Sequence, residues 1–236
     1  MDKNDISQFQ ERLVSLYLRL NGYLQTGYIP HAKKWGEAGT DIDRIGLRFP
    51  GHRQTEREIE CDSLIDIPTD SIDIVISEVK NNDLKFNDSI IDKKKRAIEN
   101  WTQILNWIGL FREKDIDSLV LSLIDLTSKN GQIENGSFDK ITYESDFGLI
   151  TIRPMLFVFE QQKSENDEKA WVNGEEILKY VWKCFCPEIK RDNCSTRYPF
   201  KLWGTEFSDI VEYIKDRHKR KLEIGTLSDM YSELIK

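Results

Sequence analysis

Four charged residues at the ends of two apolar, alternating runs have the types and spacing that chemistry requires. Asp41 and Asp43 begin the first run, and Glu78 and Lys80 close the second. Because strand side chains alternate between faces, each charged pair shares a face with large apolar residues. These are Ile45, Leu47 and Phe49 in the first run and Ile72, Ile74 and Ile76 in the second. A carboxylate at the edge of a core face is costly unless something compensates it.

Antiparallel pairing of the two runs would bring all four charged groups to one rim of a sheet. Mg²⁺ (or Mn²⁺) prefers oxygen ligands and takes one or two protein carboxylates together with water and substrate phosphate. The pattern therefore predicts a metal site with an ammonium group beside it, suited to phosphodiester hydrolysis. Asp43 lies nearer the apolar stripe and is favoured over Asp41 as the primary ligand, which leaves Asp41 as a secondary candidate. Lys80 is expected to orient water or hold the phosphate.

The competing interpretation is a cluster of surface charges that merely decorates two strand ends. Each of these residues alone would most often be a surface charge. Together they share their faces with three apolar residues in both runs, and this coincidence favours a functional site.

The arrangement resembles the PD-(D/E)xK nuclease superfamily, which includes restriction endonucleases, Holliday-junction resolvases and RecB-type nucleases. The resemblance rests on Asp43 followed by two apolar alternating residues, and on Glu78-Val79-Lys80 at the end of a strand. Residues 9–20 correspond to the opening helix of the family. Ile42 stands where the family has its proline, so Asp41 and Asp43 compete for one role.

The resemblance implies a set of site residues. Asp43, Glu78 and Lys80 would be catalytic, and the Val79 carbonyl would join the two carboxylates as a metal ligand. Glu11 on the first helix is a secondary candidate, because some relatives carry an additional acid there. Gln103 is another, since Gln103 and Trp107 have the spacing of the QxxxY motif of RecB-type relatives, with Trp in place of Tyr.

The fold class that we expect is α/β, with a restriction-endonuclease-like core in which helices flank a central mixed sheet. The core is expected over residues 1–165, and a mainly helical C-terminal extension over 166–236 is expected to pack on it. Apolar spacing predicts helices near 6–20, 92–109, 115–129, 174–185, 206–221 and 227–235, and strands within 23–32, 58–65, 138–143 and 149–160 besides the two charged runs. Ile98 and Trp101 are expected in the core stripe of the 92–109 helix, and Pro154 is expected to require a bulge or an edge.

The net charge of −7 argues against a simple coat on nucleic acid, because phosphates are neutralised by Lys and Arg. The basic residues are concentrated, however, and the run after the second strand is the candidate nucleic-acid contact. It comprises Lys93, Lys94, Lys95 and Arg96. A second run at 217–221 is better explained as a solvated helix face.

Composition indicates a cytoplasmic protein with no membrane segment, because no apolar run approaches a membrane span and the first residues are polar. The four unevenly spaced cysteines are expected to be buried free thiols rather than a zinc or disulfide framework. The three histidines form no pattern typical of acyl transfer, and no phosphate-binding GKT/S motif is present.

The function predicted from the sequence is a Mg²⁺-dependent deoxyribonuclease, an endonuclease of restriction or phage defence. The expected partners are DNA and either a second copy of the chain or another subunit of a defence system. The alternative is an inactive subunit that keeps the nuclease fold and binds or assembles on nucleic acid. The complete set of Asp43, Glu78 and Lys80 speaks against that alternative.

Overall fold

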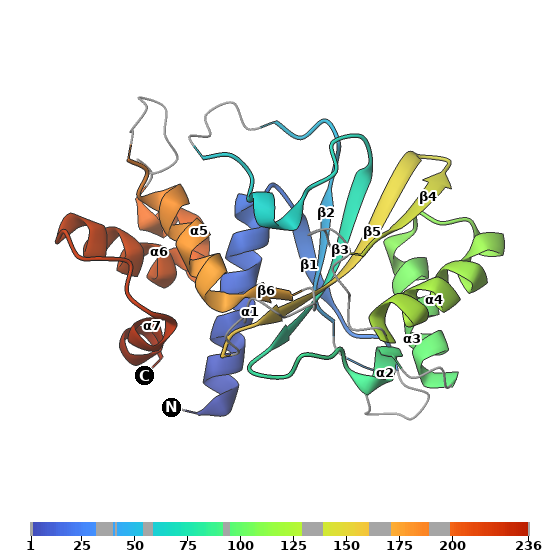
Figure 1. The fold of residues 1–236 in the computed structure, drawn as a ribbon, viewed down its shortest axis with the longest axis horizontal. Helices are drawn as coiled ribbons and strands as arrows, with labels where there is room; N and C mark the ends of the chain where they lie inside the picture. The colour runs from blue at the N-terminus through green and yellow to red at the C-terminus, as the bar shows by residue number, and fades with distance from the viewer. Residues whose placement is uncertain are drawn as a thin grey trace.

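The computed structural model describes residues 2–31, 40, 42–53, 59–91, 95–128, 139–160, 171–188 and 199–235. A mixed sheet stands between two layers of helices (Figure 1). The helices are α1 (Lys3–Leu20), α2 (Asp88–Ile91), α3 (Lys95–Ile108), α4 (Glu113–Ser128), α5 (Gly174–Phe185), α6 (Gly204–Lys219) and α7 (Leu227–Leu234), with 3₁₀ turns η1 (Ser63–Ile65) and η3 (Phe200–Trp203). The strands are β1 (Leu24–Tyr28), β2 (Ile42–Arg48), β3 (Ile72–Lys80), β4 (Ile141–Ser145), β5 (Gly148–Val158) and β6 (Trp171–Asn173).

The six described strands follow the order β1-β2-β3-β5-β4, with β6 also paired to β5. β1, β2 and β3 are successive antiparallel neighbours, whereas β3 and β5 are parallel. The expected α/β class with a mixed sheet flanked by helices is confirmed. β6 belongs to this sheet, although the sequence predicts a mainly helical extension over 166–236 and no strand there. The boundary at residues 165–166 lies outside the described residues.

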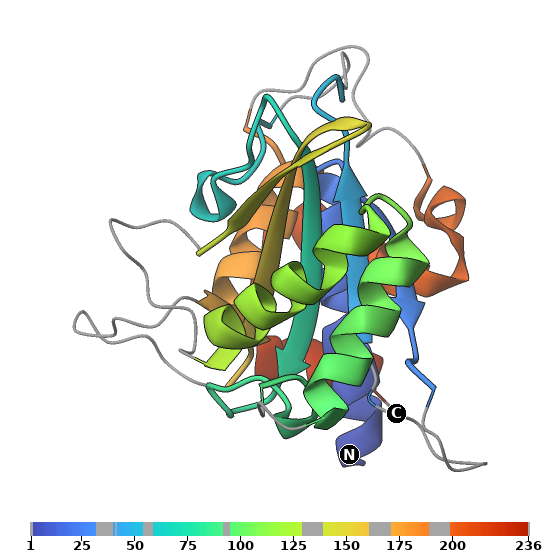
Figure 2. The ribbon, with the colours of Figure 1, turned by 90° about the vertical axis from the view of Figure 1, so that its right-hand side faces the viewer.

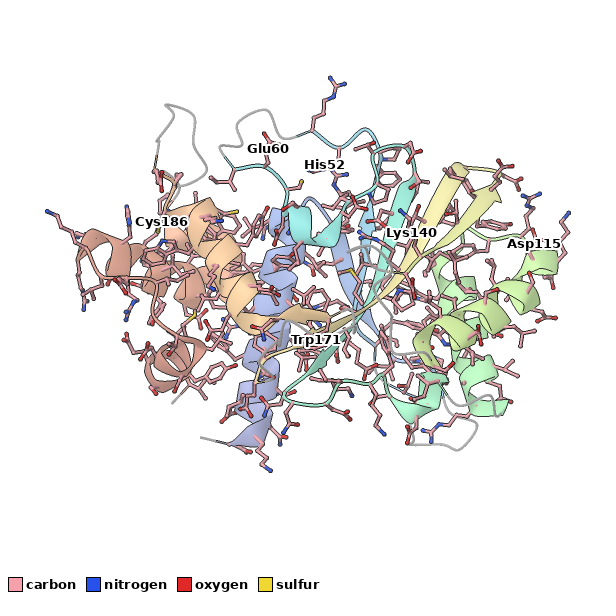
Figure 3. All side chains as sticks on the ribbon, viewed as in Figure 1. His52, Glu60, Asp115, Lys140, Trp171 and Cys186 are labelled. Carbon is pink, nitrogen blue, oxygen red and sulfur yellow. The ribbon has the colours of Figure 1, made fainter. Side chains whose placement is uncertain are left out.

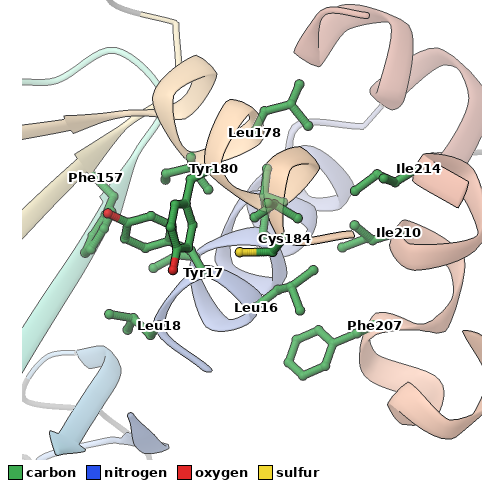
Figure 4. Close-up of a cluster of buried hydrophobic side chains, with 14 of the residues drawn as sticks. Leu16, Tyr17, Leu18, Phe157, Leu178, Tyr180, Cys184, Phe207, Ile210 and Ile214 are labelled. Carbon is green, nitrogen blue, oxygen red and sulfur yellow. The ribbon is translucent and has the colours of Figure 1, made fainter. Parts of the chain in front are cut away.

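Each face of the sheet carries its own hydrophobic core, because residues along β3 alternate between the two. Val75 belongs to the cluster that includes residues of α1, α5, α6 and α7. Figure 4 shows part of this cluster, with Tyr17 of α1 beside Phe157 of β5. Ile74 and Ile76 pack instead with α3 and α4, the helices that cover the face turned toward the viewer in Figure 2. Strand alternation therefore decides which helices each functional side chain meets.

Most of the predicted elements are present, but several details of the prediction are wrong. Ile98 is 38% exposed, and Ala97 takes its place beside Trp101 in the core. The strand expected over 58–65 is replaced by η1 in its described part, because the Asp62 side chain accepts the Leu64 N–H (3.1 Å) and so favours a turn. Phe49, expected to continue the apolar face of its strand, lies past the end of β2 and is 48% exposed.

Pro154 lies in the interior strand β5 without disturbing its pairing with β3. On the other side of β5, β4 pairs as far as Ile152 and β6 begins to pair only at Leu156. Pro154 falls in the gap between these two partners, where a missing N–H costs no ladder bond.

A buried ion pair on the α1 side joins β3 to β5. The Arg153 Nε donates to Asp73 Oδ1 (2.9 Å), and its Nη2 contacts both Asp73 Oδ2 and the Tyr23 hydroxyl. The Arg153 Nη1 donates to the carbonyl of Ile65. Both charged residues are almost inaccessible to solvent, and burial raises the pKa of Tyr23. The network therefore connects four separate segments through one guanidinium group.

Removing one member of this network should be severely destabilising, because it leaves its partner's charge buried and unpaired. We expect Arg153→Met to lower the free energy of unfolding by about 3–5 kcal/mol, measured by urea denaturation. Arg220→Met is the matched control, because Arg220 pairs with Asp216 on the surface, and it should cost less than about 1 kcal/mol. Equal costs for the two variants would contradict a structural role for the buried pair.

No helix in these described ranges is long and apolar enough to cross a lipid bilayer.

Candidate active site at the end of β3

The two charged runs meet at one end of the sheet. In the β2–β3 register, Arg44 lies opposite Ser77 and Ile45 opposite Ile76, which places Asp43 and Glu78 at the next position of the ladder. Ile45 and Ile76 belong to the core beneath α3 and α4. Glu78 and Lys80 alternate with Ile76, so their side chains share that face at its rim. The β1–β2 register shifts between Ile45 and Ile42, so the Asp43 side chain is placed by its hydrogen bond to β3 and not by alternation. The antiparallel pairing expected from the sequence is confirmed.

Asp43 is bound directly to the tripeptide that ends β3. Its Oδ2 accepts the backbone N–H of Val79 at 2.6 Å. The Lys80 carbonyl accepts from the Phe159 N–H (3.1 Å) on the β5 side of the strand. Because successive backbone groups of a strand point to opposite sides, the Val79 carbonyl is turned toward β2, the side on which Asp43 lies. The proposed carbonyl ligand and the Asp43 carboxylate thus share one side of β3.

Glu78 and Lys80 form a closed cluster with Asn87, the residue that precedes α2. The Glu78 side chain is only 5% exposed, and its Oε1 lies 2.8 Å from the Lys80 ammonium. The same ammonium donates to Asn87 Oδ1 at 2.6 Å, and the Asn87 N–H lies 3.5 Å from Glu78 Oε2. Sequence reasoning missed Asn87. The signal that could have identified it is the preference of Asn for the position before a helix.

The position of Asn87 depends on residues of α3 that hold α2 in place. The Asn100 side chain donates to the carbonyl of Ser89 (2.9 Å), and the indole of Trp101 donates to that of Ile90 (2.9 Å). The Ser89 hydroxyl also donates to Thr40 (2.7 Å), which shortly precedes the acidic strand. Thr40, the end of β3 and α3 are therefore connected through α2.

Gln103 lies on α3, and its side chain bonds the backbone of His31 and not the groups that bond Asp43 and Glu78. Its Oε1 accepts the backbone N–H of His31 (2.8 Å), and its Nε2 donates to the carbonyl of the same residue (3.1 Å). One turn later, the Trp107 ring stacks on Tyr28 at a centroid distance of 4.9 Å. Both residues of the QxxxW spacing thus hold the chain that leaves β1.

Glu11 lies on α1, on the sheet face opposite Glu78 and Lys80. Its carboxylate is 3.9 Å from the guanidinium of Arg44, which projects toward α1 and bonds Ser15. Gln10, its neighbour, makes the contact between α1 and the end of β3. The Gln10 amide donates to the Asn81 side chain (2.9 Å) and to the Tyr231 hydroxyl (3.1 Å), and burial raises the pKa of Tyr231 to about 12.

Several expected residues lie outside the described part of the chain. These include Asp41, Lys93 and Lys94, and the Lys95 side chain. Arg96 is described and is exposed near the start of α3, on the helix that borders the site. Within the described ranges, no three His, Cys, Asp or Glu side chains gather as a metal-holding group. Asp43 and Glu78 are two carboxylates, the number that Mg²⁺ commonly takes from a protein.

The described cysteines form no metal framework. Cys184 and Cys186 are thiols buried at the end of α5, as expected, and Cys61 is a half-buried thiol. Cys186 and His52 come from different elements of the fold (Figure 3). Cys194 lies outside the described residues.

The chain matches no protein-family model, no curated protein and no solved structure. The geometry of the chain's own residues is therefore the basis for assigning a function.

The contacts among Glu78, Lys80 and Asn87 lead to a prediction about stability, which is tested without an activity assay. Asn87→Ala should lower the free energy of unfolding by about 1.5–3 kcal/mol, the range for a hydrogen bond to a charged group, in urea denaturation. Asn82→Ala, an exposed asparagine of the same loop, is the control and should change it by less than about 0.5 kcal/mol.

A double-mutant cycle tests whether Asn87 stabilises the protein through its hydrogen bond with Lys80. In a Lys80→Met background, Asn87→Ala should cost clearly less, because the ammonium that it holds is gone. An unchanged cost would show that Asn87 acts through α2 and not through Lys80.

Proposed function

We propose that this protein is a metal-dependent nuclease that hydrolyses DNA phosphodiester bonds as an endonuclease, on a restriction-endonuclease-like core. The observation that carries the proposal is the 2.6 Å hydrogen bond from the Val79 N–H to Asp43 Oδ2. This bond connects Asp43 of β2 to the Glu78-Val79-Lys80 tripeptide of β3. It brings Asp43 next to the strand end that carries Glu78 and Lys80, although the two segments are distant in sequence. A role in restriction or phage defence rests on the resemblance of these motifs to those of the PD-(D/E)xK nuclease superfamily.

The donor set suits a hard cation. Asp43 and Glu78 would hold Mg²⁺ (or Mn²⁺) through carboxylate oxygens, with the Val79 carbonyl as a third oxygen ligand. When bound, the cation would lower the pKa of a bound water and offset negative charge on the phosphate. Asp41, outside the described residues, remains a secondary ligand candidate. The proposed ligands are all oxygen atoms, as this metal class prefers.

Lys80 would position the reacting groups electrostatically. An ammonium has three N–H donors, and two acceptors of Lys80 are Glu78 Oε1 and Asn87 Oδ1. Two fixed donors define the direction of the third, which is the one that would reach a phosphate oxygen or the attacking water. Such a preorganised charge stabilises the developing negative charge without rearranging during the reaction.

One observation favours the alternative of an inactive nucleic-acid-binding or assembly subunit. Glu78 is already neutralised by Lys80, and Asp43 already accepts a backbone N–H. A cluster that is satisfied by the protein's own groups can be stable without a cation. Metal affinity therefore separates the two functions.

Conservative substitutions at the site should abolish cleavage while the protein stays folded. We expect Asp43→Asn, Glu78→Gln and Lys80→Met each to lower the rate of cleavage of supercoiled plasmid in Mg²⁺ by at least about 100-fold, by analogy with the removal of one transition-state donor. Asp117→Asn and Lys114→Met, at exposed positions of α4, are the controls and should cleave as the unaltered protein does.

Metal binding is measured on the same proteins. Mg²⁺ or Mn²⁺ should raise the Tm of the unaltered protein, because a ligand that binds only the folded state stabilises it. The rise should be lost in Asp43→Asn and Glu78→Gln and kept in Asp117→Asn. A metal-independent Tm together with no cleavage of DNA or RNA would favour the inactive subunit.

The basic run is expected to supply the grip on the substrate backbone. Replacing Lys93, Lys94, Lys95 and Arg96 together by Ala should weaken duplex binding and flatten its salt dependence, by about 0.9 in the log–log slope for each phosphate that the variant no longer neutralises. The matched control removes four exposed charges elsewhere: Lys201, Lys219, Arg220 and Lys221. Equal slopes for the two variants would assign the 93–96 run to the solvated surface.

A further inference from the structure

An open apolar pocket lies on the sheet face that carries the candidate site. It has a volume of about 320 Å³ and is formed between strands β1–β3 and the last turn of α3. We call it the edge pocket, and the side chains that line it include Leu24, Thr26, Leu47, Ile74, Trp107 and Ile108. β1 is the terminal strand in the order of the described sheet, so the pocket opens at the sheet's edge.

The edge pocket and the candidate site share strands β2 and β3. Its wall includes Ile45 and Leu47, which follow Asp43 by two and four residues along β2. Two strand residues span about 7 Å, so the nearer wall lies roughly two stacked nucleotides, at about 3.4 Å each, from the proposed metal ligands. A nucleic acid strand whose phosphate reaches Asp43 could therefore place a neighbouring nucleotide at the pocket.

The chemistry of the lining suits a base and not a phosphate. Among the described residues that line the pocket, none has a charged side chain. Trp107 supplies an indole that is 48% exposed, and Leu24 beside it is 66% exposed. The stacking contact with Tyr28 holds the Trp107 ring in place, and Thr26 adds a polar group to the apolar wall. A rigid aromatic group with an apolar surround is how proteins bind unstacked bases without reading sequence.

We propose that the edge pocket binds an unpaired base of the substrate, so that the nuclease acts next to single-stranded nucleotides. A base inside a duplex is stacked on both faces and paired at its edge, and it cannot enter a pocket of this kind without being extruded. This inference rests on the proposed nuclease function, since it uses the distance to Asp43. The base would stack on or against Trp107, while the phosphates on either side stay outside the apolar lining.

The test separates bases from phosphates. Binding of the full-length protein to a labelled dT20 and to an abasic 20-mer with the same phosphates is measured by fluorescence anisotropy in EDTA, which prevents metal-dependent cleavage. The unaltered protein should bind dT20 about tenfold more tightly, the size expected from stacking of one base. Trp107→Ala and Leu24→Ala should reduce this preference to less than about threefold, and Trp107→Phe should retain it.

Matched variants control for general surface effects. Leu121→Ala on α4 and Phe147→Ala in the β4–β5 turn remove side chains that are 61% and 64% exposed, and they should keep the preference. The melting temperature of each variant is measured by circular dichroism, so that a folding defect is not read as weakened binding. A blunt 20-bp duplex should bind the pocket variants and the unaltered protein equally well.

Each result decides the inference. Equal affinity of the unaltered protein for dT20 and the abasic 20-mer would overturn it, and so would a preference that Trp107→Ala and Leu24→Ala leave intact. A concentration-dependent dimer that Leu24→Ala abolishes, without any base preference, would overturn it and assign the pocket to self-association. Base preference without cleavage of any substrate would sink the nuclease function and leave the pocket standing. Cleavage without base preference would support the nuclease function and overturn the proposed base binding at the edge pocket.

Discussion

The Asp73–Arg153 ion pair is the interaction on which the placement of the sheet depends. An Arg buried to this degree is tolerated only because its donors are satisfied by Asp73, Tyr23 and the carbonyl of Ile65. These partners come from β3, the residue before β1 and the turn η1. Any shift in the β3–β5 register would separate them and leave a charge unpaired. The network thus fixes the two central strands relative to each other and to the chain around them.

Fixing β3 also fixes Glu78 and Lys80 of the candidate site, because these two residues lie on the same strand as Asp73. Asp73 projects toward α1, whereas Glu78 and Lys80 project toward α3 and α4. One strand therefore carries a structural ion pair on one face near its start and a charged, partly accessible cluster on the other face at its end. The deep core tolerates a satisfied pair that never meets solvent. The rim keeps Lys80 19% exposed, within reach of an incoming ligand.

The rim cluster is balanced without any cation, and this balance affects how a cation can bind. A cation that takes an oxygen of Glu78 must compete with Lys80, while Asn87 gives the displaced ammonium another acceptor. Asn87 is held in turn by α2 and the α3 residues Asn100 and Trp101. The position of Lys80 is therefore set by the helical layer and not by β3 alone. The edge pocket uses the other end of α3, so one helix borders both the proposed chemistry and the proposed base site.

The sequence by itself determined where most helices and strands lie and which side chains of β3 share a face of the sheet. Alternation placed Glu78 and Lys80 on the face of Ile74 and Ile76, and helical periodicity located α4 through α7, because both patterns are local properties of chain geometry. Tertiary structure decided what local patterns do not encode. Gln10 and Asp73 acquire partners distant in sequence, and Gln103 binds His31. Asn87 meets Lys80 across the loop that follows β3, and Ile98 faces outward while Ala97 faces inward. A side chain's partner depends on which elements pack against it, and that is a property of the assembled fold.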